Sequence, residues 1–401
     1  MKKTYLLVFF VLFLCLSSCT TEMPEAPVPS EQEEDITVAE PDSIDVSLFD
    51  AADNLICNPY NRVFRNIPGM VLHTTRAYGD RLFYINKKTD EQRIFCFDPL
   101  CDHQDCLASV SPYAQYYLWS SADSCLYATG YDMMTGGNDG HLYRIDMMTH
   151  ETVLAVEGNG NEWRQMLANE QYIFLMRALK DGGFEILRYD PVNKRCDTLS
   201  PPSGRTFSDL KVSGNTFLVS FMDEPTSYLT DCDFAVYTPT ELNSSVLYLD
   251  GMVAYIASDE RELDVGRVNT ARHLDRYDLN TGERTRLLSV DGVIFDPVGF
   301  DGDYVYYLLN PLQDGTNDRM EEYGDILYRI SVNGGEGEPM VNFDMEHTGL
   351  EYELYVYEIC CCDGVIYCNV KGESREYSAE HFGTITQNAD GIWVFQTIST
   401  E

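Results

Sequence analysis

The sequence Asp301-Gly302-Asp303, with the apolar run Val305-Tyr306-Tyr307 behind it, is one copy of a pattern that decides the fold. A polar turn signal followed by alternating aromatic and aliphatic residues recurs seven times, at a mean period of about 47 residues. The seven turn signals are Gly79-Asp80, Asp123-Ser124, Asn169-Glu170, Gly214-Asn215, Asp250-Gly251, Asp301-Gly302-Asp303 and Asp363-Gly364. Because glycine supplies the positive φ of a tight turn, the pattern predicts a series of antiparallel hairpins.

A second pattern falls midway in most repeats, where a strand-like run ends in an acidic residue or serine and a turn. Its copies are Leu142-Tyr143-Arg144-Ile145-Asp146, Leu187-Arg188-Tyr189-Asp190, Leu274-Asp275-Arg276-Tyr277-Asp278 and Leu327-Tyr328-Arg329-Ile330-Ser331. The two patterns together predict four antiparallel strands in each repeat. One such sheet cannot bury both of its faces, so several sheets must stack around an axis. We therefore expect an all-β fold with a single β-propeller of seven four-stranded blades. Six or eight blades are alternatives, and a pair of β-sandwiches or a β-solenoid are the competing folds.

Composition limits the functions that this chain can have. It has 401 residues, of which 44% are hydrophobic, and 65 acidic residues against 28 Lys and Arg give a formal charge of -37. A hydrophobic content of 44% is typical of a globular fold. A surface with so large a negative charge repels phosphate backbones, so we expect no nucleic-acid partner.

The N-terminus has the features of an export signal. Lys2 and Lys3 precede an apolar run over residues 5–16, which is too short to span a bilayer permanently. The stretch Leu16-Ser17-Ser18-Cys19 resembles the bacterial lipobox, in which the cysteine thiol receives a diacylglycerol. We expect residues 1–18 to be a lipoprotein signal peptide and Cys19 to be the lipidated N-terminus of the mature chain. An ordinary secretory peptide with an incidental Cys19 is the alternative.

The next segment, residues 19–45, is acidic and contains proline but no Lys or Arg. Such a composition cannot form a core and is typical of a solvated tether. The predicted organisation is thus a signal peptide, a tether, and a β-propeller over residues 46–401. The protein would be a monomer outside the cytoplasmic membrane, anchored to the bacterial cell surface by the lipid on Cys19, which would include palmitate.

With these features the chain resembles a family, the lipoproteins of gut Gram-positive bacteria that carry an uncharacterised YWTD-like, quinoprotein-like β-propeller. The resemblance covers about residues 60 to 401. It rests on the two repeated patterns and on the segment Cys96-Phe97-Asp98-Pro99-Leu100-Cys101-Asp102-His103. Membership would imply a surface location and a binding or scaffold role. No catalytic residue comes with the resemblance.

Long links between the second and third strands indicate a binding face. They are expected at residues 129 to 140, 222 to 233, 258 to 273, 309 to 325 and 371 to 382, whereas the first turn of each repeat has two or three residues. Variable loops at one end of a rigid scaffold often carry binding. The acidic ligand face that we predict includes Asp259, Glu260, Glu262, Asp318, Glu321, Glu322 and Tyr323. It would suit a cationic peptide or polymer, a metal ion or a glycan, although solvated loops would have the same composition.

The cysteines allow several interpretations. Eleven remain in the mature chain apart from Cys19, and an odd number cannot pair completely. Cys96, Cys101, His103 and Cys106 could hold a structural zinc ion, form a local disulfide such as Cys101 to Cys106, or stay free thiols. We expect this segment to replace the outer strand of the first repeat and a cross-link within it to hold its backbone in place. In Cys360-Cys361-Cys362, pairing of residue 362 with residue 365 would put Cys361 on the same face as Cys368, as buried small apolar residues.

No local catalytic motif is present, since the sequence lacks a nucleophile elbow, a His-Glu-x-x-His motif and a phosphate-binding glycine loop. Two classes of function remain. The first is a non-catalytic propeller that binds a peptide, a glycan or an envelope partner. The alternative is an extracellular hydrolase or lyase that acts on carbohydrate. Convergence of carboxylates or histidines with perturbed pKa values would favour the enzyme.

Overall fold

The computed structural model describes most of the chain after residue 63. The described residues are 64–75, 81–96, 117–129, 140–158, 163–179, 182–222, 224–242, 246–258, 273–290, 293–311, 326–343, 354–362, 364–373 and 378–398. Backbone contacts divide the chain into two compact units, Met1–Pro41 and Asp42–Glu401, and every described residue belongs to the second. The predicted signal peptide, the tether and Cys19 lie outside the described residues.

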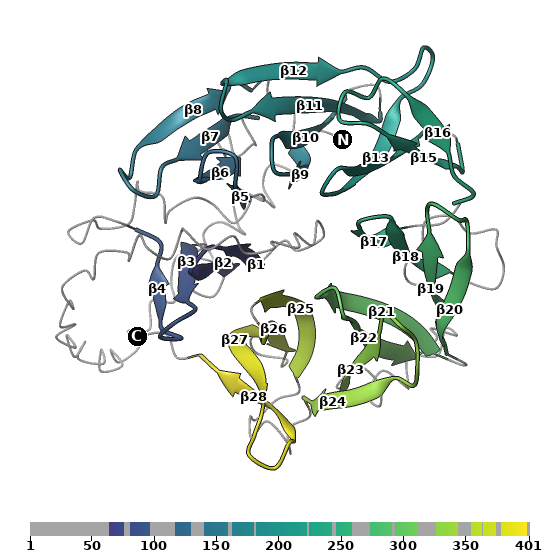
Figure 1. Cartoon of the computed structure of the whole chain (residues 1–401). Helices are drawn as coiled ribbons and strands as arrows, with labels where there is room; N and C mark the ends of the chain where they lie inside the picture. The colour runs from purple at the N-terminus through teal and green to yellow at the C-terminus, as the bar shows by residue number, and fades with distance from the viewer. Residues whose placement is uncertain are drawn as a thin grey trace, which may run out of the picture. The chain divides into compact units, whose positions relative to one another are not determined.

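The regular structure of the described residues consists of strands alone, which confirms the all-β prediction. Consecutive strands pair antiparallel in seven successive meanders of four strands (Figure 1). The first two meanders are β1 (Phe64–Ile67), β2 (Met70–Thr75), β3 (Arg81–Asn86) and β4 (Gln92–Ile94), then β5 (Tyr117–Ser120), β6 (Cys125–Thr129), β7 (Leu142–Ile145) and β8 (Thr152–Val156). Next come β9 (Trp163–Ala168), β10 (Ile173–Ala178), β11 (Phe184–Asp190) and β12 (Arg195–Leu199), then β13 (Phe207–Ser213), β14 (Thr216–Phe221), β15 (Ser227–Thr230) and β16 (Tyr237–Pro239). The fifth meander is β17 (Val246–Asp250), β18 (Val253–Ser258), β19 (His273–Asp278) and β20 (Arg284–Ser289). The sixth is β21 (Val293–Phe300), β22 (Tyr304–Pro311), β23 (Ile326–Ser331) and β24 (Glu338–Asn342). The seventh is β25 (Leu354–Cys362), β26 (Val365–Glu373), β27 (Ser378–Gln387) and β28 (Trp393–Thr397).

These meanders form six sheets rather than seven. Five meanders are separate four-stranded sheets, whereas β9–β12 and β13–β16 join into one eight-stranded sheet. The junction is a single residue pair, Phe184 of β11 with Phe207 of β13. Within the described ranges, no helix is long and apolar enough to cross a membrane.

The first turn of a meander is held by the aspartate of the turn signal. Asp123 Oδ2 accepts hydrogen bonds from Tyr127 OH on β6 and from Arg144 Nε on β7, both at 2.9 Å. In the sixth meander, Asp301 Oδ2 accepts from Tyr306 OH on β22 at 2.7 Å. In both meanders the tyrosine of the second strand thus contacts the aspartate of the turn signal, and in the second meander the arginine of the third strand joins this contact.

The turn between the third and fourth strands is formed by the residue that ends the second pattern. Asp146 Oδ1 accepts the backbone N–H groups of Met148 at 2.9 Å and Thr149 at 3.1 Å. Asp190 and Asp278 bind the backbone two and three residues ahead in the same way. An aspartate that bonds its own backbone in this manner imitates a turn and stops the strand. The acidic residue is therefore explained by turn formation.

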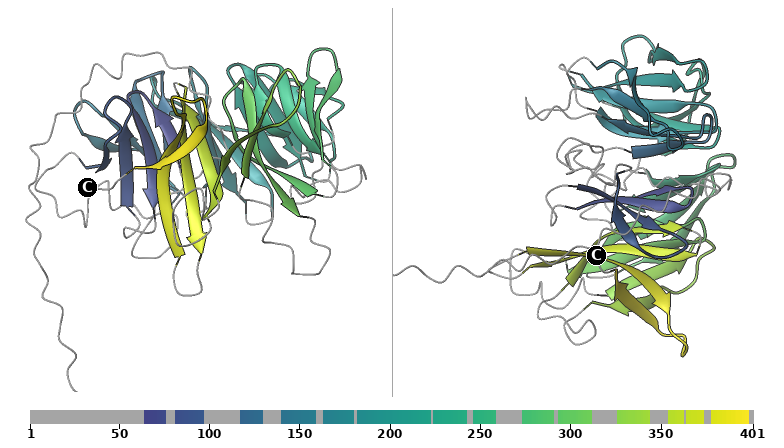
Figure 2. Two further views of the ribbon diagram at one scale, coloured as in Figure 1. Left: turned by 90° about the horizontal axis from the view of Figure 1, so that it is seen from below. Right: turned by 90° about the vertical axis from the view of Figure 1, so that its left-hand side faces the viewer.

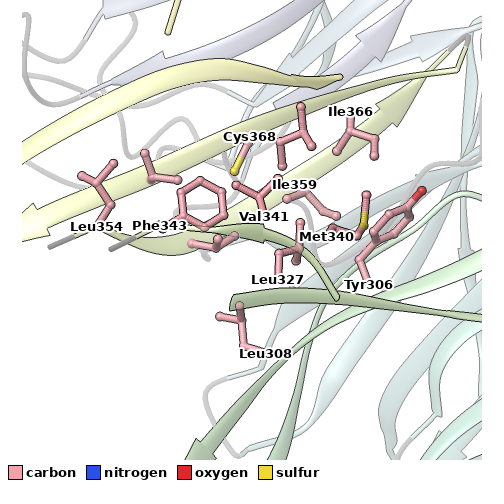
Figure 3. Packing of buried hydrophobic residues seen from close by; sticks show 13 residues of the cluster. Tyr306, Leu308, Leu327, Met340, Val341, Phe343, Leu354, Ile359, Ile366 and Cys368 are labelled. Carbon is pink, nitrogen blue, oxygen red and sulfur yellow. The ribbon is translucent and has the colours of Figure 1, made fainter. Parts of the chain in front are cut away.

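Apolar packing joins each meander to the next. Seven hydrophobic clusters lie between successive meanders, and the cluster between β21–β24 and β25–β28 includes Tyr306, Leu327, Phe343 and Cys368 (Figure 3). The seventh cluster connects the last meander to the first. The axes of the strands in successive sheets are roughly aligned with one another (Figure 2). Each described sheet contains only strands that are consecutive in the sequence, so the first and last meanders meet through side chains and not through a shared sheet.

The contact between the first and last meanders encloses a histidine. Val71 and Ile85 pack there against Tyr367 and Phe382. His73 on β2 is completely buried, with its ring 4.1 Å from that of Phe382 and 5.6 Å from that of Phe83.

The structure corrects the prediction for the first repeat. Six of the seven turn signals connect the first and second strands of a meander, but Gly79-Asp80 falls between β2 and β3. The first turn of this meander is Pro68-Gly69, where Gly69 has a φ of 72°. The fourth strand, β4, is therefore complete before Cys96, and the expectation that the segment from Cys96 to Cys106 replaces an outer strand was wrong.

Two of the predicted long links are also corrected. The segment 222 to 233 contains strand β15. The segment 371 to 382 is reduced to residues 374–377, because β26 extends to Glu373 and β27 starts at Ser378. The link predicted at 258 to 273 corresponds to residues 259–272, whereas the one predicted at 309 to 325 starts only at residue 312, because β22 extends to Pro311.

Candidate functional site

Most residues that we predicted to form a site lie outside the described part of the chain. These are Cys101, His103, Cys106, Asp259, Glu260, Glu262, Asp318, Glu321, Glu322 and Tyr323. Cys96, which is half-buried, is described. Among the described residues, no group of three or more His, Cys, Asp or Glu could hold a metal ion. Zinc, a disulfide and free thiols therefore remain alternatives for the segment from Cys96 to Cys106, and the acidic ligand face remains a prediction.

The predicted pairing and shared face of the second cysteine group are confirmed, although Cys361 itself is half-buried rather than buried. Cys362 pairs with Val365, and Cys361 packs with Cys368 in the cluster next to β21–β24. Cys360 and Cys362 take the opposite face, in the cluster next to the first meander. All four are free thiols, and burial raises the pKa of the Cys368 thiol. Such thiols are poor nucleophiles at neutral pH.

The first strand of each meander is the inner strand, because these strands contact one another between sheets. β1 contacts β5, β5 contacts β9, β9 contacts β13, β13 contacts β17, β21 contacts β25, and β25 contacts β1. In five successive meanders the inner strand contains a β-bulge. The extra residues are Arg164, Ser208, Leu247, Val298 and Tyr357. A bulge turns the following side chains to the other face, and bulges are frequent next to functional sites.

Polar side chains lie at or near these bulges. We call them the inner-strand cluster, and it consists of Gln165, Asp209, Lys211, Tyr248, Asp296 and Glu358. They come from five different meanders, β9–β12 to β25–β28. Contacts and charge interactions connect five of them in two groups, which are Asp209 with Lys211, and Tyr248 with Asp296 and Glu358.

The bulge in β13 explains how a charged pair comes to be buried there. Because Ser208 is an extra residue, Phe207 packs in the same cluster as Leu210 and Val212, and Asp209 and Lys211 take the opposite face. The Lys211 Nζ lies 3.1 Å from Asp209 Oδ2, and the lysine side chain is 3% exposed. Asp209 Oδ1 also accepts the N–H of Leu210 at 2.9 Å.

Burial sets the proton equilibria of this pair. It lowers the pKa of Lys211 to about 7 and raises the pKa of Asp209 to about 7. The 3.1 Å contact between the ammonium and carboxylate groups favours the charged form of each and so opposes both shifts. The Asp209 side chain is nevertheless 42% exposed. It is therefore the member of the pair that a ligand can reach.

The second group joins three meanders. Tyr248 of β17 is 4% exposed and its ring stacks on Phe300 at 5.1 Å. Burial raises the pKa of Tyr248, and the nearby charges of Asp296 on β21 and Glu358 on β25 raise it further. Glu358 is itself buried. A phenol that stays protonated beside two carboxyl groups can donate a hydrogen bond to a ligand, while the carboxylates attract a positive charge.

Sequence analysis missed the inner-strand cluster for a physical reason. In Phe207–Ser213 the polar and apolar residues alternate except at Ser208 and Asp209, which are two adjacent polar residues. Strict alternation would put Phe207, Asp209 and Lys211 on one face. The bulge at Ser208 breaks this rule, and two adjacent polar residues in a strand do not by themselves indicate a bulge. The signal that was available is a lysine within an otherwise well-packed inner strand.

Comparisons with known proteins agree with this architecture. No protein-family model and no curated protein matches the sequence. Among solved structures, the chain is similar to the beta-propeller domain of the Trilobed protease from Pyrococcus furiosus, with a TM-score of 0.55 and 12% identity over 84% of this chain and 97% of that one. The fold is propeller-like. The likeness is to the fold alone, because the identity is low.

Two further structures belong to peptidases. A prolyl endopeptidase matches with a TM-score of 0.52 and 9% identity, over 87% of this chain and 55% of the other. An acylaminoacyl peptidase matches with a TM-score of 0.50 and 10% identity, over 82% of this chain and 50% of the other. This chain thus covers about half of each peptidase.

The buried pair on β13 gives a test of its role. Replacing Lys211 by Met removes a buried ammonium ion and keeps a similar volume, so we expect the free energy of unfolding to change by less than about 1 kcal/mol or to rise. Asp209→Asn removes the carboxylate that faces the lysine, and we expect a loss of about 1–3 kcal/mol. Urea unfolding at pH 6 measures both. Glu91→Gln, in an exposed ion pair with Arg93, is the control and should change stability little. A large loss in Lys211→Met would show that the ion pair holds the fold together.

Proposed function

We propose that this chain is a lipid-anchored protein of the bacterial cell surface whose seven-bladed propeller binds a peptide, glycan or envelope partner without catalysis. The lipobox-like stretch Leu16-Ser17-Ser18-Cys19 and the acidic tether support the anchor. The seven four-stranded meanders and the seven clusters between them support the blade number. The same features support membership in the lipoprotein family that the sequence resembles.

The observation that carries the binding role is the distribution of polar groups on the inner strands. The carboxyl groups of Asp209, Asp296 and Glu358 come from the inner strands of three different meanders, and each of these strands contains a bulge. Together with the net charge of -37, they favour a partner that presents a positive group, such as a cationic peptide.

Nucleophilic catalysis has less support from the described residues. A serine does meet a histidine, since Ser289 Oγ lies 3.0 Å from His273 Nδ1. A serine hydrolase also needs an acid that orients this histidine. Asp275, the buried acid on the same strand as His273, instead accepts hydrogen bonds from Arg284 and Arg286. Asp275 therefore does not supply the acid of an acid–histidine–serine relay.

One observation supports the alternative function, which is a carbohydrate hydrolase or lyase. Burial raises the pKa of Asp209 to about 7, which is the range in which a carboxylic acid can donate a proton in catalysis. The two functions separate in one experiment. The protein is offered a glycan array, a cationic-peptide array and soluble polysaccharides, with binding and release of reducing ends measured in parallel. Retained ligand without product supports the binding role, whereas turnover that is lost in Asp209→Asn supports the enzyme.

Cys19→Ala tests the anchor. We expect the variant to leave the membrane fraction and appear in the soluble fraction, because the thiol that would carry the lipid is gone. Fractionation followed by immunoblotting measures this, with Cys15→Ala as the control that keeps the lipobox. Unchanged retention of Cys19→Ala in the membrane would contradict the proposed lipid anchor but would leave the binding role of the propeller open to its own test.

A further inference from the structure

Two arginines on β20 share one buried carboxylate. The Asp275 side chain is 1% exposed, while those of Arg284 and Arg286 are 41% and 47% exposed. Asp275 Oδ2 accepts a hydrogen bond from Arg284 Nε at 2.8 Å and one from Ser258 Oγ at 3.1 Å, and Asp275 Oδ1 accepts from Arg286 Nε. The carboxylate thus fixes both guanidinium groups side by side at the surface.

A bulge in β20 produces this arrangement. Leu288 pairs with Leu274 and Arg286 pairs with Asp275, so Leu287 is an extra residue. Both leucines consequently pack into the apolar cluster next to β21–β24. The residues on either side of them, Ser289 and Arg286, then share the opposite face with His273 and Asp275. A regular strand would have placed Ser289 and Arg286 on different faces.

The charges at this place do not balance within the described residues. At Asp197, which also contacts two arginines, a second acid, Asp233, contacts Arg188. The ion pairs of Arg177 and Arg329 each contain one arginine and one acid. At Asp275 two guanidinium groups face one carboxylate, which is an excess of one positive charge among the described residues.

The free edge of Arg286 has the geometry of an anion receptor. Its Nε is directed to Asp275, and no hydrogen bond from its Nη atoms is formed within the described part of the chain. Two parallel N–H groups of a guanidinium match two oxygens of a carboxylate. Ser258, the last residue of β18, accepts a hydrogen bond from Arg284 Nη2 at 3.1 Å. We propose that Arg286 and Arg284 form a binding site for a carboxylate group of a ligand.

The charge of the protein favours a singly charged ligand. A net charge of -37 repels every anion, and a doubly charged phosphate is repelled about twice as strongly as a carboxylate. One uncompensated guanidinium balances one negative charge. The ligand is therefore a carboxylate on an otherwise neutral body, and its binding does not depend on the partner of the inner-strand cluster.

The test uses the full chain in non-ionic detergent and an NMR titration with sodium glucuronate. We expect saturable binding that is at least tenfold weaker in Arg286→Gln and several-fold weaker in Arg286→Lys. Binding should be unchanged in Arg93→Gln, because Arg93 on β4 pairs with Glu91 in the turn before that strand. Arg286→Lys keeps a positive charge without the two parallel N–H groups, so it also serves if Arg286→Gln unfolds. Glucose, which lacks the carboxylate, should not bind at this site.

Three results would overturn the proposal. The first is the absence of saturable glucuronate binding to the wild-type protein, which would indicate that other groups of the chain occupy the arginines. The second is equal affinity in wild type and Arg286→Gln. The third is binding of inorganic phosphate at pH 7.5 as tightly as glucuronate, which would show that the site does not select a singly charged carboxylate.

Discussion

Acidification from pH 7 to pH 4 is expected to destabilise this protein strongly through a single side chain, His73. This histidine is completely buried between the first and last meanders, and the buried side chain of Gln92 lies near it. Burial lowers the pKa of His73 from 6.5 to about 3. The folded protein therefore keeps the imidazole neutral, while the unfolded chain takes up a proton once the pH falls below 6.5.

The direction and size of the effect follow from proton linkage. Between pH 6.5 and pH 3 the unfolded chain binds more protons at this site, so stability is complete above pH 6.5 and declines as the pH falls. The full difference between a pKa of 6.5 and one of about 3 corresponds to about 5 kcal/mol. Most of that loss is reached by pH 4. It is comparable to the whole stability of many domains.

His73→Gln separates this effect from the protonation of carboxylates. Glutamine has a similar volume, keeps a polar group for Gln92 and does not titrate, so the variant should lose about 1 kcal/mol at pH 7 but should depend less on pH between 6.5 and 4. Urea unfolding at several pH values measures both quantities. His150→Asn, at an exposed turn position with a φ of 61° that asparagine tolerates, is the control. Parallel pH profiles for wild type and His73→Gln would contradict the prediction.

The sequence allowed the repeats to be predicted because the turn chemistry is local. Asp123 and Asp146 each bind groups within a few residues, and such contacts leave a visible pattern in one stretch of chain. The prediction for the first repeat was wrong because its first strand, Phe64–Ile67, is short and contains Arg65 and Asn66. The turn after this strand is Pro68-Gly69 rather than an acidic turn signal. The prediction therefore assigned the next strand pair to the hairpin.

The candidate site could not be predicted in the same way. Tyr248, Asp296 and Glu358 are more than 40 residues apart in the sequence, and only the succession of sheets brings them together. Their orientation also depends on bulges, which change the face of a side chain without changing the residue types. A single sequence contains the residues of such a site but not the register that directs them.

The second large effect is expected at Asp275. Removing one partner of a buried ion pair usually costs about 3–5 kcal/mol, because the other charge stays behind without compensation. Here Arg284 and Arg286 retain contact with water, so we expect Asp275→Asn to lose about 3 kcal/mol of unfolding free energy, near the lower end of that range. Thermal and urea unfolding at pH 7 measure the loss.

A matched control exists on β12. Asp197 also contacts two arginines, but its side chain is 30% exposed, so Asp197→Asn should lose less than about 1 kcal/mol. The origin of the effect is then resolved by a double-mutant cycle with Arg286→Gln. If repulsion between two like charges causes the loss in Asp275→Asn, adding Arg286→Gln should restore about 1 kcal/mol or more, because one of the two charges is removed. Additive losses would mean that repulsion between the two arginines is not the cause of the loss, whereas a loss at Asp275 no larger than at Asp197 would mean that burial of Asp275 contributes little to stability. In that case the carboxylate would serve to hold the arginines for a ligand and not to hold the sheet together.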